Sequence, residues 1–159
     1  MSVLPWWLHV LSLVSLLFAA LCALIIIWDI ARGHRQHMWI MNVVWPATAL
    51  YAGPIALWGY FGIGRLATRQ RVQEAKAKGE KLPALRKPFW QSVATGVTHC
   101  GSGCTLGDLI AEWFVLAVPI SLFGSTVFGT WALDYVLALT LGIAFQYFTI
   151  APMRDLAVG

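Results

Sequence analysis

The sequence predicts an all-α, polytopic membrane protein with about four transmembrane helices. Of its 159 residues, 59% are hydrophobic and only 11% are charged, whereas a soluble domain carries about 25% charged residues. A soluble fold of this length has too little interior for so much apolar surface, but lipid can surround such helices instead of water. Nine Trp residues agree, because Trp gathers at membrane interfaces. The length predicts a single membrane domain over residues 1–159.

The first two apolar runs predict two spans. Residues 6–28 contain no charged side chain and are long enough to cross a hydrocarbon core of about 30 Å. No Lys or Arg precedes this run and no clear cleavage site follows it, so we expect a retained span rather than a signal peptide. Residues 38–63 predict the second span, which Pro46 and Pro54 should kink by removing backbone donors.

A basic loop is predicted over residues 64–88. The stretch from Arg65 to Lys87 holds eight of the eleven Lys and Arg residues. Because it lies between apolar runs, a cytoplasmic position beside anionic lipid is a simpler interpretation than nucleic-acid binding. A short solvated helix is expected over residues 67–78. With Arg32 and Arg35 alone outside, both termini are predicted to be cytoplasmic.

The next region predicts an interrupted third helix and then a fourth span. Residues 89–100 are too few and too polar to span alone, so they predict a half-helix. Glycines at 101 and 103 predict a break. The third span is expected over residues 104–123 and the fourth over residues 130–150.

The interruption concentrates the side chains that are best able to carry chemistry. His99, Cys100, Cys104, Asp108 and Glu112 lie within fourteen positions. Residues four apart differ by only about 40° around a helix, so the last three share one face. Acids inside a span are costly, which predicts that this face points into the bundle rather than to lipid.

These five residues are the predicted metal site, with copper or zinc as the expected ion. Thiolate and imidazole suit Cu(I) and Zn(II), and the carboxylates would act as harder ligands or proton carriers. The chain is therefore expected to bind, and as an extension to transport, a transition-metal ion. A second metal site near Asp29 is the weaker alternative for His34 and His37.

Three alternatives to the metal site stay open. Cys100 and Cys104 form a thiol-disulfide redox pair if their Cα atoms lie within about 7 Å. Asp108, Glu112 and Asp134 form a path for ions or protons. The third alternative is a structural or assembly module, in which the glycines only allow helices to approach closely. No catalytic sequence motif is present, so no enzyme is predicted, and a homo-oligomer is expected because four spans are few for a transporter.

Several blocks resemble a bacterial membrane family that is catalogued only as a domain of unknown function. The main block is an H-C-G-x-G-C-x-x-G-D signature at residues 99–108, followed by Glu112-Trp113. The others begin at Met41-Asn42, Pro88-Phe89-Trp90 and Phe145-Gln146-Tyr147. The resemblance implies a bacterial inner-membrane protein without an established activity. It also implies apolar segments beyond Arg154, so this chain is expected to be a short member or a fragment.

Overall fold

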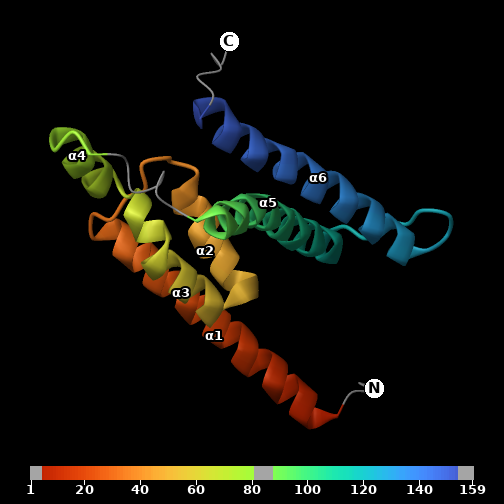
Figure 1. Cartoon of the computed structure of the whole chain (residues 1–159). Coiled ribbons are helices and arrows are strands. Elements are labelled where there is room, and N and C mark those ends of the chain that lie inside the picture. Colours follow the sequence, from red (N-terminus) through yellow and green to blue (C-terminus); the bar gives the residue numbers. More distant parts are fainter. Residues whose placement is uncertain (1–4, 81–87, 154–159) are drawn as a thin grey trace. The chain divides into compact units, whose positions relative to one another are not determined.

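The computed structural model describes residues 5–80 and 88–153, with side chains described as far as residue 149. The described residues form α-helices and one short 3₁₀ helix, and they contain no β-strand (Figure 1). The all-α prediction is therefore confirmed for this part of the chain. Two compact units divide the chain, Met1–Lys87 and Pro88–Gly159. The prediction of one membrane domain stays a prediction.

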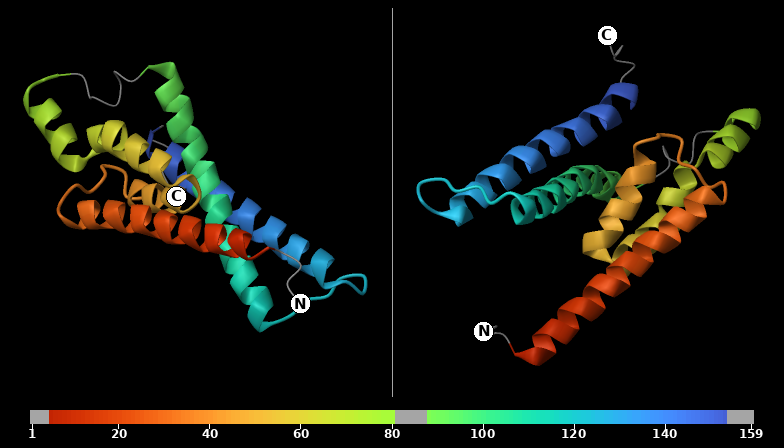
Figure 2. Two further views of the ribbon diagram at one scale, coloured as in Figure 1. Left: turned by 90° about the horizontal axis from the view of Figure 1, so that it is seen from below. Right: turned by 180° about the vertical axis from the view of Figure 1, so that it is seen from behind.

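The first unit is built on α1 (Trp6–Ala31), which covers the predicted first span. Two shorter helices, α2 (Met41–Ala52) and α3 (Pro54–Gly62), pack against α1. The buried residues of α1 are Cys22, Ala23 and Ile26, all in its C-terminal half. Figures 1 and 2 show the N-terminal half of α1 extending beyond both shorter helices.

The range predicted as the second span, 38–63, is two helices separated by a turn at Gly53. Gly53 has a backbone φ of +51°, a conformation that residues other than glycine rarely adopt. Pro54 follows at the first position of α3, where a missing N–H is harmless. Pro46 and Pro54 are predicted to kink a single helix. Instead, α2 ends before Gly53, and α3 runs back toward the end of α1. Pro46 remains inside α2.

The turn at Gly53 brings the end of α3 back to the end of α1. A 3₁₀ helix (Gly64–Ala67) and α4 (Arg69–Ala77) follow α3. The backbone N–H of Arg69 donates to the Arg35 carbonyl at 2.9 Å, and that of His37 donates to the Ala67 carbonyl at 2.9 Å. The expected short helix over 67–78 is confirmed by α4. Placing Arg35 across a membrane from Arg65 was wrong, because these hydrogen bonds join the two segments directly.

The second unit consists of α5 (Phe89–Ala117) and α6 (Thr126–Met153). The predicted half-helix, glycine break and third span form one continuous helix, α5, which ends at Ala117 before Pro119. The predicted break was therefore wrong. Glycine lowers helix propensity by only about 1 kcal/mol relative to Ala, and tertiary packing overrides such a preference. The fourth predicted span corresponds to α6.

The packing partner of the glycines is α6, which runs antiparallel to α5 (Figure 1). A Cβ added to Gly103 would lie 2.8 Å from the Leu141 carbonyl oxygen, and one added to Gly107 would lie 2.6 Å from the Ala138 Cα. Real Cβ atoms essentially never approach other atoms so closely. The two helix backbones are therefore in direct contact at Gly103 and Gly107, and we call this pair the glycine contact.

Two of the described helices are long and apolar enough to cross a membrane, Trp6–Ala31 and Thr126–Thr149. Only 17% and 11% of their most apolar windows are buried within the structure, which leaves most of their surface for another environment. These helices support a membrane protein. The number of four spans stays a prediction.

Candidate functional site

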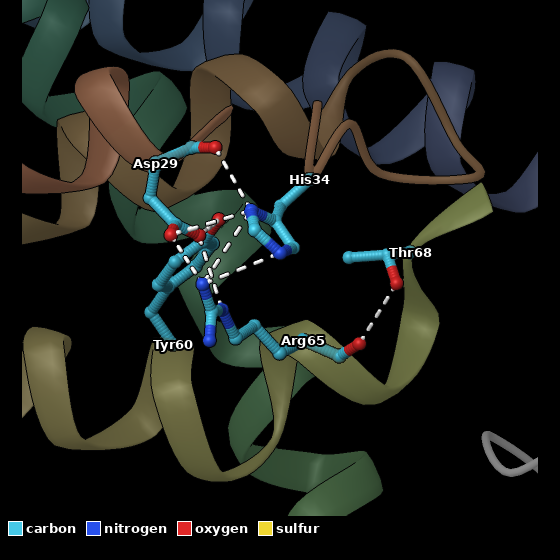
Figure 3. A network of polar contacts seen from close by, with 5 residues as sticks. All are labelled: Asp29, His34, Tyr60, Arg65 and Thr68. Carbon is cyan, nitrogen blue, oxygen red and sulfur yellow. Dashed lines mark hydrogen bonds and ion pairs between the residues drawn. The ribbon is translucent and has the colours of Figure 1, made fainter. Parts of the chain in front are cut away.

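The structure assembles a polar network where α1, α3 and the 3₁₀ helix meet (Figure 3). We define the Asp29 network as Asp29, His34, Tyr60 and Arg65. The Arg65 guanidinium donates to both carboxylate oxygens of Asp29, with the Nε–Oδ2 pair at 3.1 Å. The Tyr60 hydroxyl donates to Oδ2 at 2.7 Å. This arrangement fixes the ends of three helices to one carboxylate.

The pair of Asp29 and Arg65 combines a largely buried carboxylate with a guanidinium that bonds both of its oxygens. The Asp29 side chain is 12% exposed and that of Arg65 is 38% exposed, so the carboxylate is largely removed from water. A guanidinium that bonds both oxygens satisfies that charge with a fixed geometry. The hydrogen bond to Asp29 raises the pKa of Arg65 above its usual value. Arg65 therefore stays charged throughout the physiological range of pH.

A cavity of about 300 Å³ lies beside the network. It is lined by polar and charged residues of three segments, namely His34, Arg65, Thr68, Gln70, Arg71 and Glu74. The two arginines are not free cations, because Arg65 is paired with Asp29 and Arg71 lies 4.0 Å from Glu74. The cavity is thus a polar recess with little net charge.

The five residues of the predicted metal site do not converge. His99 is buried, and its Nδ1 lies 3.1 Å from the Thr149 hydroxyl of α6. Cys100 is exposed and Cys104 is half-buried, whereas Asp108 and Glu112 are both exposed on α5. Within residues 5–80 and 88–153, no group of three or more His, Cys, Asp and Glu side chains is close enough to hold a metal ion.

The two thiols of the predicted site do lie together. A Cβ added to Gly142 would be 3.5 Å from the Cys104 sulfur and 3.9 Å from the Cys100 sulfur. Both sulfurs therefore cover the same glycine of α6. They are free thiols in the structure. Their carboxylate neighbour along the same face is Asp108.

The remaining predicted residues are separate from this pair. Asp134 of α6 is half-buried, and its Oδ1 has no hydrogen-bond partner among the described residues. His34 contacts Asp29, with Nδ1 3.4 Å from a carboxylate oxygen, whereas His37 is exposed. Asp134 therefore adds no described contact to the predicted proton path. His34 and His37 do not form the second metal site together, since only His34 contacts Asp29.

The Asp29 network was missed as a site, although a signal was present. Asp29 is the only acid before Glu74, and it directly follows a long apolar run. An acid at that position needs a partner, and Arg65 is one of the cations that follow the next apolar run.

The sequence of the second unit is similar to that of a protein family. Residues 89–159 match the family model DUF4396. This family is described as a domain of unknown function. The match begins at the start of α5, so the expected domain of unknown function is confirmed for these residues, while the Met41-Asn42 block lies outside it. No curated protein and no solved structure matches the chain.

Proposed function

We propose that this chain is an integral membrane protein of the bacterial inner membrane, and that its α5–α6 pair is a structural or assembly module without enzymatic activity. Helices α1 and α6 are long and apolar enough to cross the bilayer. Helix α5 has 29 residues, about 43 Å, and packs antiparallel along α6. Because α5 contacts α6 at His99, Gly103 and Gly107, we propose that it crosses the bilayer beside α6.

The glycine contact is the observation that carries the structural role. Lipid tails give apolar helices no hydrophobic reason to associate, so membrane helices pair through small residues that permit close packing. Gly103 and Gly107 supply this surface on α5, and Ala138 and Gly142 supply it on α6. Away from the contact the pair exposes large apolar side chains, including Ile110, Leu116, Val136 and Ile143. Lipid or another protein would cover them.

Two measurements test this proposal. The full chain should remain with bacterial inner membranes after alkaline carbonate washing, and release into the soluble fraction would contradict a membrane protein. The purified chain should unfold at lower denaturant when Gly107 is replaced by Val, because the new side chain meets the α6 backbone. Gly96→Val is the matched control, since nothing lies within 4 Å of a Cβ there. Equal losses in both variants would contradict a role for the glycine contact.

Metal binding is the second candidate, and the paired thiols favour it. We propose Cys100 and Cys104 as the ligands of a soft ion such as Cu(I), with Asp108 one turn further along the same face. His99 would contribute only through Nε2, which has no partner among the described residues. The same two thiols could instead form a redox pair.

One titration separates these candidates. The purified, reduced chain would be titrated with Cu(I) and with Zn(II), beside the Cys100→Ser and Cys104→Ser variants and a Cys22→Ser control. A metal site predicts stoichiometric binding that both test variants lose and the control keeps. Absence of binding to the reduced native chain would remove the metal proposal. Loss of two free thiols after mild oxidation, without metal binding, would favour the redox pair.

A further inference from the structure

We propose that α2 and α3 form a re-entrant hairpin, which enters the bilayer from the side of the basic residues and returns to that side. The anionic headgroup layer on that side is the partner of the basic end of the first unit. The inference rests on the proposed membrane location and concerns the first unit alone. It replaces a second span by a hairpin that does not cross.

Length is the first argument. Helix α2 has 12 residues and α3 has 9 residues, about 18 Å and 14 Å respectively. Neither reaches across a hydrocarbon core of about 30 Å. Helix α1, with 26 residues, is about 39 Å long and does reach across. The buried positions of α1 begin only at Cys22, so the hairpin covers α1 over about half the depth of the membrane.

Contacts at the open end of the hairpin give the second argument. The carboxylate of Asp29, near the end of α1, accepts hydrogen bonds from Tyr60 of α3 and from Arg65 after α3 (Figure 3). The Arg69 N–H bonds the Arg35 carbonyl, on the loop that leads into α2. The chain therefore leaves α3 at the level where it entered α2.

The closed end of the hairpin suits a lipid interior. The N–H of Gly53 donates to the Ala49 carbonyl at 2.9 Å, and its own carbonyl accepts from Ala56 at 3.1 Å. Pro54 contributes no N–H. Irregular backbone at membrane depth is tolerated when its polar groups are satisfied within the protein. Beside this turn, Ile55 is 73% exposed and Trp58 is 69% exposed, which presents apolar side chains outward.

Charge gives the orientation. Residues 38–64 contain no Asp, Glu, Lys or Arg, and neither do residues 5–28. All charged residues of the described first unit lie at the open end of the hairpin, in residues 29–35 and 65–80. Seven of them are Lys or Arg: Arg32, Arg35, Arg65, Arg69, Arg71, Lys76 and Lys78. Basic segments next to a membrane favour the cytoplasmic leaflet with its anionic lipids.

The consequence is a different topology for the start of the chain. The first residues of α1 lie on the periplasmic side, opposite Arg35 and Arg69, which share the cytoplasmic side. The earlier expectation of a cytoplasmic N-terminus required 38–63 to cross. The positive-inside count also improves, since Arg32 and Arg35 join the other basic residues.

Thiol labelling in the full chain tests the hairpin. The native cysteines are replaced by Ala, and single cysteines are introduced as Pro5→Cys, Arg35→Cys, Arg69→Cys and Ile55→Cys. A membrane-impermeant maleimide is added to spheroplasts and to inverted membrane vesicles. We expect Pro5→Cys to label in spheroplasts, and Arg35→Cys and Arg69→Cys to label only in inverted vesicles. Ile55→Cys should resist the reagent in both until detergent is added.

The outcomes separate the hairpin from the membrane location. Labelling of positions 35 and 69 from opposite sides would overturn the hairpin while the chain remains membrane-bound. Labelling of positions 5 and 35 from the same side would overturn the crossing by α1. Labelling of all four positions in both preparations, together with release by carbonate, would overturn the membrane proposal itself and the hairpin with it. If Arg35→Cys or Arg69→Cys is unstable, Arg32→Cys and Gln73→Cys replace them, because both of these positions are exposed.

Discussion

The two units hold their helices together by different means. In the first unit, large and polar side chains fill the space between helices: Trp45 packs against Tyr60 with ring centroids 5.7 Å apart, and Arg65 bonds Asp29. In the second unit, side chains are absent from the closest contact, and backbones meet at Gly103 and Gly107. The comparison shows that glycine serves as a turn at Gly53 and as a packing surface in α5.

The largest expected effect is at the glycine contact. Gly107→Ala places a methyl group 2.6 Å from the Ala138 backbone, so α5 and α6 must separate. We expect a loss of about 1–3 kcal/mol in the free energy of unfolding. The measurement is denaturant unfolding in detergent micelles, followed by Trp fluorescence. Gly96→Ala, in open space on the same helix, should be neutral or stabilising by up to about 1 kcal/mol. If the Gly107→Ala protein were as stable as the Gly96→Ala protein, the claim that backbone contact at Gly107 holds the second unit together would be contradicted.

The side-chain packing of the first unit is tested at Gly64. A Cβ there would lie 2.7 Å from the Trp45 indole, whereas nothing lies within 4 Å of one at Gly62. Gly64→Ala should therefore cost about 1–2 kcal/mol, less than Gly107→Ala, because a side chain yields more readily than a backbone. Gly62→Ala is the control in the same unfolding assay. Combining Gly64→Ala with Trp45→Leu should recover part of the loss, and strict additivity of the two changes would argue against the contact.

The polar part of the first unit gives the next effect. Arg65→Met leaves the Asp29 carboxylate without its cation and should lower the free energy of unfolding by about 1–2 kcal/mol. Arg71→Met is the matched control, since its pair with Glu74 is exposed and should contribute less than about 0.5 kcal/mol. Thermal unfolding of both variants at one ionic strength checks the difference. Equal midpoints would mean that the Asp29 network does not hold the helix ends.

The smallest expected effect is at the buried polar pair of His99 in α5 and Thr149 in α6. Thr149→Val keeps the shape but removes the hydroxyl that lies 3.1 Å from His99 Nδ1. We expect a loss of about 0.5–1.5 kcal/mol, as for a typical hydrogen bond. Thr140→Val, at an exposed position of α6, is the comparison variant in the same assay. A change larger than that of Gly107→Ala would make polar bonding, rather than glycine packing, the main link of the second unit.

The sequence was sufficient for the long apolar helices. The ranges 6–28 and 130–150 agree with α1 and α6 to within a few residues, because a long apolar run with at most one charged residue has few alternatives. The glycines of α5 were misread because local propensity is a weak preference, and the partner that overrides it lies more than thirty residues away in α6.

The same limit applies to the sites. Spacing along a helix predicted one face for Cys104, Asp108 and Glu112. The predicted break separated Cys100 from them, whereas on the continuous helix α5 both cysteine sulfurs cover Gly142 of α6. Spacing could not show that His99 is turned toward Thr149, fifty residues later in the chain. The Asp29–Arg65 pair likewise depends on the return of the chain at Gly53. Each missed relation joins segments that only tertiary structure brings together.

The continuity of α5 through its glycines is the central claim, because it converts the predicted break into a packing surface. Spin labels on Val97→Cys and Trp113→Cys, in the full chain without native cysteines and reconstituted in liposomes, would measure it directly by pulsed dipolar spectroscopy. A continuous helix predicts one narrow distance distribution corresponding to a rise of about 24 Å between the two positions. A markedly shorter or bimodal distribution would show a helix broken near Gly101 and would contradict the account.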